Sequence, residues 1–232
     1  MKILISGASG GIGREISAQL AKEGHELILL CNNNTSVFQE FVDNQSPKAK
    51  VLSADLSDEK SWEDLNFENV DALINLIGIS SSGASWKIPI QEWNSVFKIN
   101  TEIPFRLAQK VIPSMRSKGF GRIIFFSSIV AQKGIFGTSA YSASKSALHG
   151  LTRTMASELI QKGITVNCIA PGYINTGMIH ELQDTFQQEI IERIPSKEFG
   201  DVQNIVNVTK FLLDKKSDYI TGQILSVNGG FE

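Results

Sequence analysis

The sequence predicts an α/β protein: a single doubly wound (Rossmann) domain, with a seven-stranded parallel sheet and helices on both faces. Three observations lead to this prediction. Seven short apolar runs rich in β-favouring residues recur along the 232 residues, helix-like segments separate them, and a glycine-rich turn directly follows the first run. Continuous apolar strands that alternate with helices are typical of a parallel sheet buried on both faces.

The seven runs are expected to form the strands in chain order. They are KILIS (2–6), ELILLC (26–31), KVLSA (50–54), DALINLI (71–77), RIIFFSS (122–128), ITVNCIA (164–170) and QILSV (223–227). Right-handed helical crossovers would join them. No linker, low-complexity tract or internal repeat interrupts the alternation, so residues 1–232 are interpreted as one domain.

Two helical segments carry special features. The longest, IQEWNSVFKINTEIPFRLAQKVIPSM, contains Asn100 and Pro104 in its interior, and both residues disfavour an unbroken helix, so a kink is expected near Asn100. Residues 177–200 read as an amphipathic helix bounded by Gly177 and Pro195. This segment leaves the ligand-binding edge of the sheet, and two interpretations stay open: a substrate lid or a plain surface helix.

Composition excludes several classes of function. A net charge of −2, with dispersed Lys and Arg residues, argues against a nucleic-acid partner. The two cysteines, Cys31 and Cys168, have no metal-ligand spacing and are expected to be buried, reduced thiols; no metal site is expected. The N-terminal apolar run is too short for a signal peptide, and no stretch is long enough to cross a bilayer. A soluble cytoplasmic protein without a membrane partner is expected.

The turn after the first strand has the context of a dinucleotide site. Gly7, Gly11 and Gly13 fall in the turn and the first helical turn, where backbone N–H groups and the helix dipole can approach a pyrophosphate. A strand precedes this turn and an amphipathic helix follows it, as such a motif requires. A merely tight strand-to-helix turn is the alternative.

Cofactor choice depends on the end of the second strand, where an acidic residue would select NAD. The chain reads Leu30, Cys31 and three asparagines from Asn32 onward, so neither a carboxylate nor an arginine stands there. We favour NADP(H) over NAD(H), with the asparagines as neutral hydrogen-bond donors. Asp55, after the third strand, could accept from the adenine amino group or belong to a helix-capping region.

Tyr141 and Lys145 are four residues apart in SAYSASKSAL, so a helix places them side by side. A neighbouring ammonium lowers the pKa of a phenol, and such a tyrosine can pass a proton near neutral pH. An exposed, solvated pair is the alternative that this short pattern alone leaves open.

Together these motifs resemble the short-chain dehydrogenase/reductase family over essentially the whole chain. The family's glycine turn appears as Ser6 to Gly13, its adenine-side Asp-Leu as Asp55-Leu56, its fourth-strand Asn-Asn-Ala-Gly as Asn75-Leu76-Ile77-Gly78, and its Pro-Gly-x-x-x-Thr as Pro171 to Thr176. Leu76 and Ile77 replace the family's smaller Asn-Ala, which bears on local hydrogen bonding behind the nicotinamide.

The resemblance implies catalytic residues Asn100, Ser128, Tyr141 and Lys145. Tyr141 would donate the proton, Ser128 would bind the carbonyl oxygen, Lys145 would lower the pKa of Tyr141 and bind the nicotinamide ribose, and Asn100 would hold a water of a proton relay. The residues expected to bind the cofactor are Gly7, Ser9, Gly11, Ile12, Gly13, Asn32, Asp55, Leu56, Asn75, Gly78, Tyr141, Lys145, Pro171, Gly172, Ile174 and Thr176.

Within the family, the ending YITGQILSVNGGF and the run IPSKEFGDVQNIVNVTKFLL are most similar to bacterial 3-oxoacyl-acyl-carrier-protein reductases of fatty acid biosynthesis. The implied function is NAD(P)H-dependent reduction of a ketone to an alcohol, or the reverse, with a 3-oxoacyl thioester as substrate. The alternatives are a dehydrogenase of a sugar, nucleotide sugar or small alcohol, and a dinucleotide sensor without turnover. The presence of both Tyr141 and Lys145 argues against the sensor.

Further expectations concern the pocket and the partners. Trp86, Ile135 and Phe136 could line an apolar pocket, although core packing is the commoner role of such residues. His180 could touch substrate from the lid, whereas His25 is expected in a turn and His149 on the catalytic helix. A small-molecule or carrier-bound acyl substrate and a homotetramer or homodimer are the expected partners. The residues considered for docking an acidic carrier are Arg116, Lys118, Arg122 and Lys162.

Overall fold

The computed structural model describes residues 1–32, 36–45, 48–176, 179 and 183–231. Seven strands form one parallel sheet in the order β3-β2-β1-β4-β5-β6-β7, which confirms the predicted sheet. The strands are β1 Lys2–Ser6, β2 Glu26–Cys31, β3 Ala49–Ser53, β4 Ala72–Asn75, β5 Gly121–Phe126, β6 Ile164–Pro171 and β7 Ile224–Val227.

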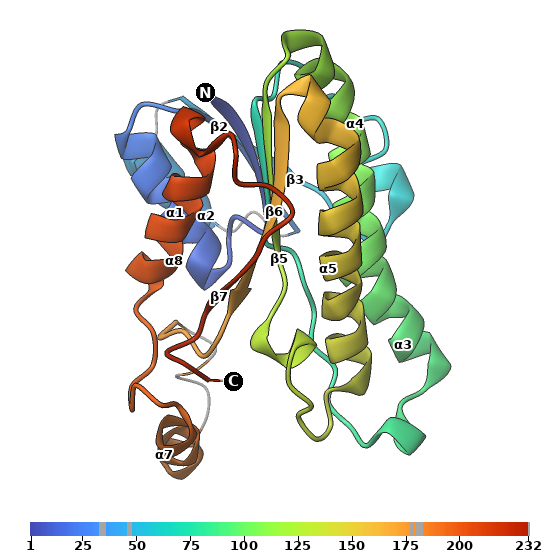
Figure 1. Cartoon of the computed structure of the whole chain (residues 1–232), viewed down its shortest axis with the longest axis vertical. Helices are drawn as coiled ribbons and strands as arrows, with labels where there is room; N and C mark the ends of the chain where they lie inside the picture. The colour runs from blue at the N-terminus through green and yellow to red at the C-terminus, as the bar shows by residue number, and fades with distance from the viewer. Residues whose placement is uncertain (33–35, 46–47, 177–178, 180–182, 232) are drawn as a thin grey trace.

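Helices cover both faces of the sheet (Figure 1). On one face lie α1 Gly11–Lys22, α2 Ser36–Gln45 and α8 Val202–Leu213; on the other lie α3 Ile90–Phe97, α4 Ile103–Lys118 and α5 Ser139–Leu159. A further helix among the described residues, α7 Asp184–Arg193, lies beyond the carboxyl ends of the strands, where Figure 1 shows it below the sheet.

Two apolar layers, one on each face of the sheet, hold these helices in place. Leu107, Val111 and Leu148 pack α4 and α5 against one face, and Ile16 and Ile205 pack α1 and α8 against the other. The central strands β1, β4, β5 and β6 are buried on both sides, which explains why they read as continuous apolar runs rather than alternating ones.

The chain reverses its direction across the sheet between β1 and β4. From β1 it proceeds outward to β2 and β3, then returns to β4 on the other side of β1 and continues to β7. In an open α/β sheet, ligands bind at the carboxyl ends of the strands beside such a reversal. The topology therefore places the ligand site where β1 and β4 end, next to the glycine-rich turn.

The structure corrects several predicted boundaries. β4 ends at Asn75 rather than at residue 77, and β5 ends at Phe126 rather than at residue 128, because the chain leaves the sheet there to form the loops at its carboxyl edge. Within the predicted helical segment 177–200, the described helix α7 begins at Asp184, after an extended Gln183, and ends at Arg193. Residues 177–178 and 180–182 lie outside the described residues, so the proposed lid at 177–200 is covered only in part.

The irregularity expected near Asn100 is present as a π-helical turn. Residues Lys98–Glu102 form this turn between α3 and α4, and Asn100 lies at its centre, fully buried. Single π-helical turns inside longer helices are frequent at functional sites. Pro104, by contrast, sits in the first turn of α4, where a missing N–H is tolerated.

Within the described ranges, no helix has the length and apolar character needed to span a membrane. Both cysteines are buried and free, as predicted. The described residues contain no cluster of three or more His, Cys, Asp and Glu side chains arranged to hold a metal ion.

Candidate active site

A cavity of about 420 Å³ opens at the carboxyl edge of the sheet. It joins the glycine-rich turn of β1 and α1, the residues after β5, the start of α5 and the residues after β6. Twelve of the eighteen predicted site residues line it: Gly7, Gly11, Ile12, Gly13, Gly78, Ser128, Tyr141, Lys145, Pro171, Gly172, Ile174 and Thr176. Segments far apart in the sequence therefore meet in one place, as the motifs predicted.

The glycine-rich turn forms one wall of the cavity and leaves the start of α1 open. Gly7 has a positive φ of 72°, which favours glycine. A Cβ on Gly13 would lie 2.4 Å from the Gly7 carbonyl oxygen, and one on Gly11 would lie 2.9 Å from the Thr176 Cβ. Gly10 caps α1 without a side-chain hydrogen bond, so no side chain occupies the first-turn N–H groups. This bare helix terminus fits a dinucleotide pyrophosphate.

Ser128 and Tyr141 meet on the opposite wall. Ser128 directly precedes a short 3₁₀ turn, Ile129–Ala131, and its Oγ accepts a hydrogen bond from Val130 N at 3.4 Å. Burial raises the pKa of the Tyr141 phenol, while its hydrogen bond with Ser128 acts in the opposite direction. Burial is the dominant influence on this pKa in the described structure, and the expectation that Lys145 lowers it stays a prediction.

Lys145 lies beneath Tyr141 with its ammonium group buried. Its Nζ donates to the carbonyl oxygens of Phe126 at 2.9 Å and Ile77 at 3.2 Å, and lies 6.0 Å from the centroid of the Tyr141 ring. Burial lowers the pKa of Lys145 to about 8. A lysine with such a pKa can exchange a proton near neutral pH.

Asn100 does not line the cavity but lies behind it. Its Oδ1 accepts from Ile79 N at 2.8 Å, and its Nδ2 donates to Ile79 O at 2.9 Å and to Ser144 Oγ at 3.0 Å. Both amide hydrogens are therefore used by the protein. The predicted water relay stays a prediction, and any such water would have to bind an oxygen acceptor here rather than the Asn100 N–H groups.

Five other predicted residues also lie outside the cavity lining: Ser9, Asn32, Asp55, Leu56 and Asn75. Leu56 is part of the apolar core, and Asn75 Oδ1 accepts from Ser6 Oγ at 2.9 Å, joining the ends of β1 and β4. Asp55 Oδ1 accepts from Ser57 N and Oγ, and Asp58 caps the short helix that follows. These residues shape the edge of the sheet around the cavity.

Several lining residues were missed by sequence reasoning. They are Gly10, Leu76, Phe126, Ser127, Ile129, Val130, Tyr173 and Ile179. All but Val130 and Ile179 lie within or directly beside a quoted motif, so adjacency to a motif was the only signal that could have found them. The apolar candidates named instead do not line the cavity: Trp86 and Phe136 are 76% and 83% exposed, and Ile135 packs against a small core cluster.

The two histidines within the described residues, His25 and His149, lie where the sequence predicted them. His25 lies in the turn after α1, with Nδ1 3.2 Å from the N-terminal amine, and His149 lies on α5. His180, the candidate for substrate contact, lies outside the described residues.

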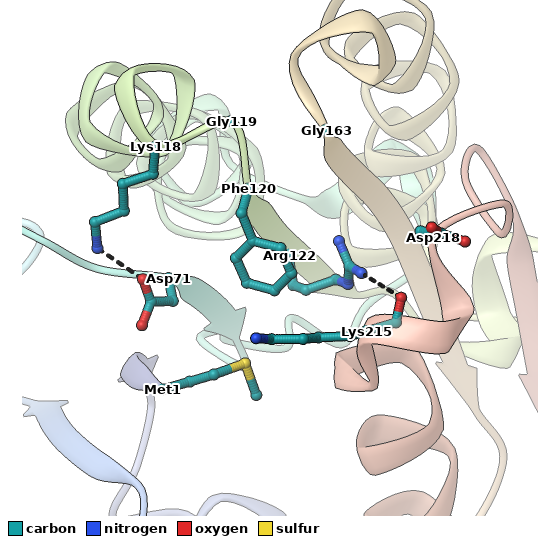
Figure 2. Close-up of a pocket in the computed structure, with 9 residues that line it drawn as sticks. All are labelled: Met1, Asp71, Lys118, Gly119, Phe120, Arg122, Gly163, Lys215 and Asp218. Carbon is teal, nitrogen blue, oxygen red and sulfur yellow. Dashed lines mark hydrogen bonds and ion pairs between the residues drawn. The ribbon is translucent and has the colours of Figure 1, made fainter.

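A second cavity, of about 580 Å³, lies at the opposite, amino edge of the sheet (Figure 2). Here the buried Arg122 donates to the carbonyl oxygens of Asp214 and Lys215, at the end of α8, and Lys118 pairs with Asp71 at 2.6 Å. These contacts join β5 and α4 to their neighbours. Lys118 and Arg122, considered above for docking a carrier at the active-site mouth, are therefore on the wrong edge for that role.

The comparisons with known proteins agree with this site. Residues 7–232 match the sequence model of a family described as enoyl-(acyl carrier protein) reductase. The chain belongs to the short-chain dehydrogenase/reductase family, and it is an NAD(P)-dependent oxidoreductase that acts on CH–OH groups and their ketones.

Individual relatives point to two substrate classes. The chain is 38% identical to 3-oxoacyl-(acyl-carrier-protein) reductase FabG of Staphylococcus epidermidis, over 98% of this chain and 97% of the relative. It is 35% identical to the protein of the same name from Escherichia coli, over 98% and 95%. A solved structure from Agrobacterium tumefaciens, described as a 2-deoxy-D-gluconate 3-dehydrogenase with bound NADP, superposes with a TM-score of 0.91 at 30% identity, covering 99% and 95%.

Proposed function

We propose that this chain reduces the 3-oxo group of an acyl thioester to a hydroxyl group, with NADPH as the reductant. The observation that carries the proposal is the composition of the cavity wall beyond Tyr141. Ile129, Val130 and Ile179 line it, and no ionised side chain other than Lys145 is among the described lining residues. An apolar wall suits an acyl chain better than a polyhydroxylated sugar, whose hydroxyl groups need hydrogen-bond partners.

The fit of the dinucleotide rests on the bare start of α1 and the glycine cradle. The turn from Gly7 to Gly13 would hold the pyrophosphate, and Pro171 to Thr176 would lie along the nicotinamide end. When bound, NADPH supplies the hydride that adds to the carbonyl carbon. The protein must then supply a proton to the oxygen and stabilise the charge that develops there.

The chain's own residues divide this task. Ser128 would hydrogen-bond the substrate oxygen, and Tyr141 would transfer its phenolic proton to it, leaving a phenolate. Lys145, whose pKa is about 8, would stabilise that phenolate and take part in returning the proton. Asn100 keeps the loop at Ile79 in place beside Lys145, and an ordered water there would complete the path to solvent.

The test follows NADPH absorbance with a 3-oxoacyl thioester, using the native chain beside Tyr141→Phe. The native chain is expected to oxidise NADPH. In the variant, kcat is expected to fall at least about a hundredfold, because phenylalanine keeps the ring but lacks the transferable phenolic proton. Tyr219→Phe is the matched control, since this tyrosine is 98% exposed and distant from the cavity. Activity that survives in Tyr141→Phe would contradict the assigned proton donor.

A sugar or sugar-acid dehydrogenase is the second candidate, favoured by the similarity to the structure described as a gluconate-type dehydrogenase. A panel of sugar acids and small alcohols, assayed with NADP and NAD in the oxidative direction, separates the two functions. Turnover of a panel member with none of the thioester would overturn the acyl assignment but keep the chemistry of Tyr141.

We further propose a preference for NADPH over NADH. Asn32 is exposed directly after β2, and the described residues at the end of that strand include no carboxylate to repel a 2′-phosphate. The expected result is a lower KM for NADPH than for NADH, and an Asn32→Asp variant that shifts the ratio at least about tenfold toward NADH by charge repulsion. An unchanged ratio would exclude this position as the selector.

The remaining expectations are proposals of the same kind. The chain would take its acyl group from a carrier protein in the cytoplasm and would assemble as a homodimer or homotetramer. Phe105 on α4 and Ile160 after α5, both 37% exposed, are apolar residues on the helical layer that would be covered. Light scattering after size-exclusion chromatography tests the assembly, for which a monomeric mass is the contradicting result.

A further inference from the structure

The face of α5 that carries Tyr141 and Lys145 also carries a third titratable side chain, that of His149. His149 follows Lys145 by four residues, as Lys145 follows Tyr141, so the three side chains form one stripe along the helix. This stripe faces the carboxyl end of β5. His149 thus belongs geometrically to the catalytic row, although it does not line the cavity.

Each member of the stripe contacts one of three consecutive residues at the end of β5. Tyr141 hydrogen-bonds with Ser128, and Lys145 donates to the Phe126 carbonyl oxygen at 2.9 Å. His149 Nε2 lies 2.9 Å from Ser127 Oγ, between these two contacts along the strand. The helix and the strand end are therefore joined at three successive positions.

Ser127 is the central residue of this contact. Its backbone N–H donates to Ile169 O on β6 at 2.8 Å, which fixes the main chain, and its side chain is buried at 5% exposure. The carbonyl that holds Lys145 is in the peptide bond between Phe126 and Ser127, and the catalytic Ser128 follows directly. A shift of Ser127 would consequently move both groups.

We propose that His149 is a positioning residue, which acts through Ser127 to hold the Phe126 carbonyl and Ser128 in register with Lys145 and Tyr141. As part of this role, the same contact would exclude water from the space behind Lys145. Cys168, fully buried on β6, also interacts with Ser127 and with Lys145, so Ser127 has interaction partners on both α5 and β6. The proposal rests on the proposed reductase function of this site.

The first measurement does not depend on turnover. Lysine labelled with ¹³C at the ε carbon allows the pKa of Lys145 to be measured by NMR, with Lys145→Arg used to assign the signal. His149→Leu removes the hydrogen bond while filling the space, and we expect water to enter behind Lys145 and raise its pKa from about 8 toward the ordinary value. Ser127→Ala should raise it likewise. His149→Gln, whose amide can reach the position of Nε2, should leave it near the native value.

The second measurement compares kcat and KM in the thioester assay. His149→Leu and Ser127→Ala are each expected to lower kcat about tenfold, with KM for NADPH within about twofold of native, since misplaced groups impair the reacting geometry. Because both act through one contact, the double variant should be no worse than the poorer single variant. His149→Gln should restore kcat to within about threefold of the native value.

Opposite results would overturn the proposal. The pKa of Lys145 could be unchanged in both His149→Leu and Ser127→Ala, or these variants could lose thermal stability while kcat stays unchanged. Either result would show that His149 contributes only to packing. Multiplicative losses in the double variant would show that the two residues act separately. If the native chain turns over no substrate, the proposed function fails, whereas the NMR titration still decides the role of His149.

Discussion

The side-chain amide of Asn100 forms a two-point hydrogen bond with the backbone of Ile79: Ile79 N donates to Oδ1 at 2.8 Å and Nδ2 donates to Ile79 O at 2.9 Å. The pair connects the π-helical turn between α3 and α4 to the loop that leaves β4. Only an amide side chain offers a donor and an acceptor in this arrangement. The loop beside Lys145 is therefore held by a side chain from another element.

Asn100→Ala is expected to lower the free energy of unfolding by about 2–4 kcal/mol, because it removes a fully buried amide that makes three hydrogen bonds, two of them with the partly buried backbone groups of Ile79. Denaturant titration followed by tryptophan fluorescence measures the change. Asn94→Ala, at an exposed position of α3, is the matched control and should alter stability by less than about 0.5 kcal/mol. Equal effects of the two substitutions would contradict the importance of the amide contact.

Lys145 should leave a signature in the pH dependence of stability. Its pKa of about 8 in the folded chain lies below the ordinary 10.5, so between these values the unfolded chain binds a proton that the folded chain has released. This lysine therefore makes stability rise with pH through that window, whereas below pH 8 the full cost of burying the charge is present.

The measurement compares native and Lys145→Met chains by denaturant unfolding across that window. Lys145→Met should be more stable than the native chain at about pH 8, and this difference in the free energy of unfolding should shrink by up to roughly 3 kcal/mol as the pH rises to 10.5. Lys162→Met, at an exposed position, should follow the native curve. Parallel curves for the native chain and Lys145→Met would show that Lys145 does not titrate as inferred.

Gly13→Ala should destabilise the chain and impair cofactor binding together. The added Cβ would lie 2.4 Å from Gly7 O and 2.9 Å from Ala8 Cα, and both are backbone atoms, so α1 must move away from the turn. We expect a loss of at least about 2 kcal/mol in unfolding free energy and a weakened NADPH affinity by fluorescence titration. Gly134→Ala, where a Cβ meets nothing within 4 Å, should change neither.

Gly78→Ala should separate activity from stability. Its Cβ would lie 2.9 Å from Lys145 Nζ, the end of a flexible side chain, so the ammonium can move aside at little cost in folding. The expected result is a loss of at least about tenfold in kcat with a stability change below about 1 kcal/mol. Gly83→Ala serves as the control, since its nearest neighbour is Ile88 Cγ1 at 3.7 Å. Full activity in Gly78→Ala would mean that the position of Lys145 is not critical.

Local patterns were sufficient for the fold and for most of the cavity lining. The apolar runs identified all seven strands: the central strands read as continuous runs because they are buried on both faces of the sheet, and the partly buried edge strands β3 and β7 keep shorter apolar runs. Boundaries at the carboxyl edge were less accurate: β4 and β5 end earlier than their apolar runs, because Ile77 and Ser128 belong to the loops that build the cavity.

Charge and surface position could not be predicted in the same way. Nothing in the sequence around Arg122 indicates that it is buried against the end of α8, far along the chain, or that Lys118 pairs with Asp71. The apolar Trp86 and Phe136 look like pocket residues but are exposed. Such outcomes depend on which elements pack together, and no local spacing contains that information.

The sequence by itself determined the class of fold, the glycine cradle and the pairing of Tyr141 with Lys145, because strand burial, turn geometry and helical spacing are set by neighbouring residues. Only the tertiary structure decided the environment of those residues. Burial lowers the pKa of Lys145 and raises that of Tyr141, and the row from Tyr141 to His149 meets the end of β5, because the desolvation and the hydrogen bonds come from parts of the chain that folding alone brings together.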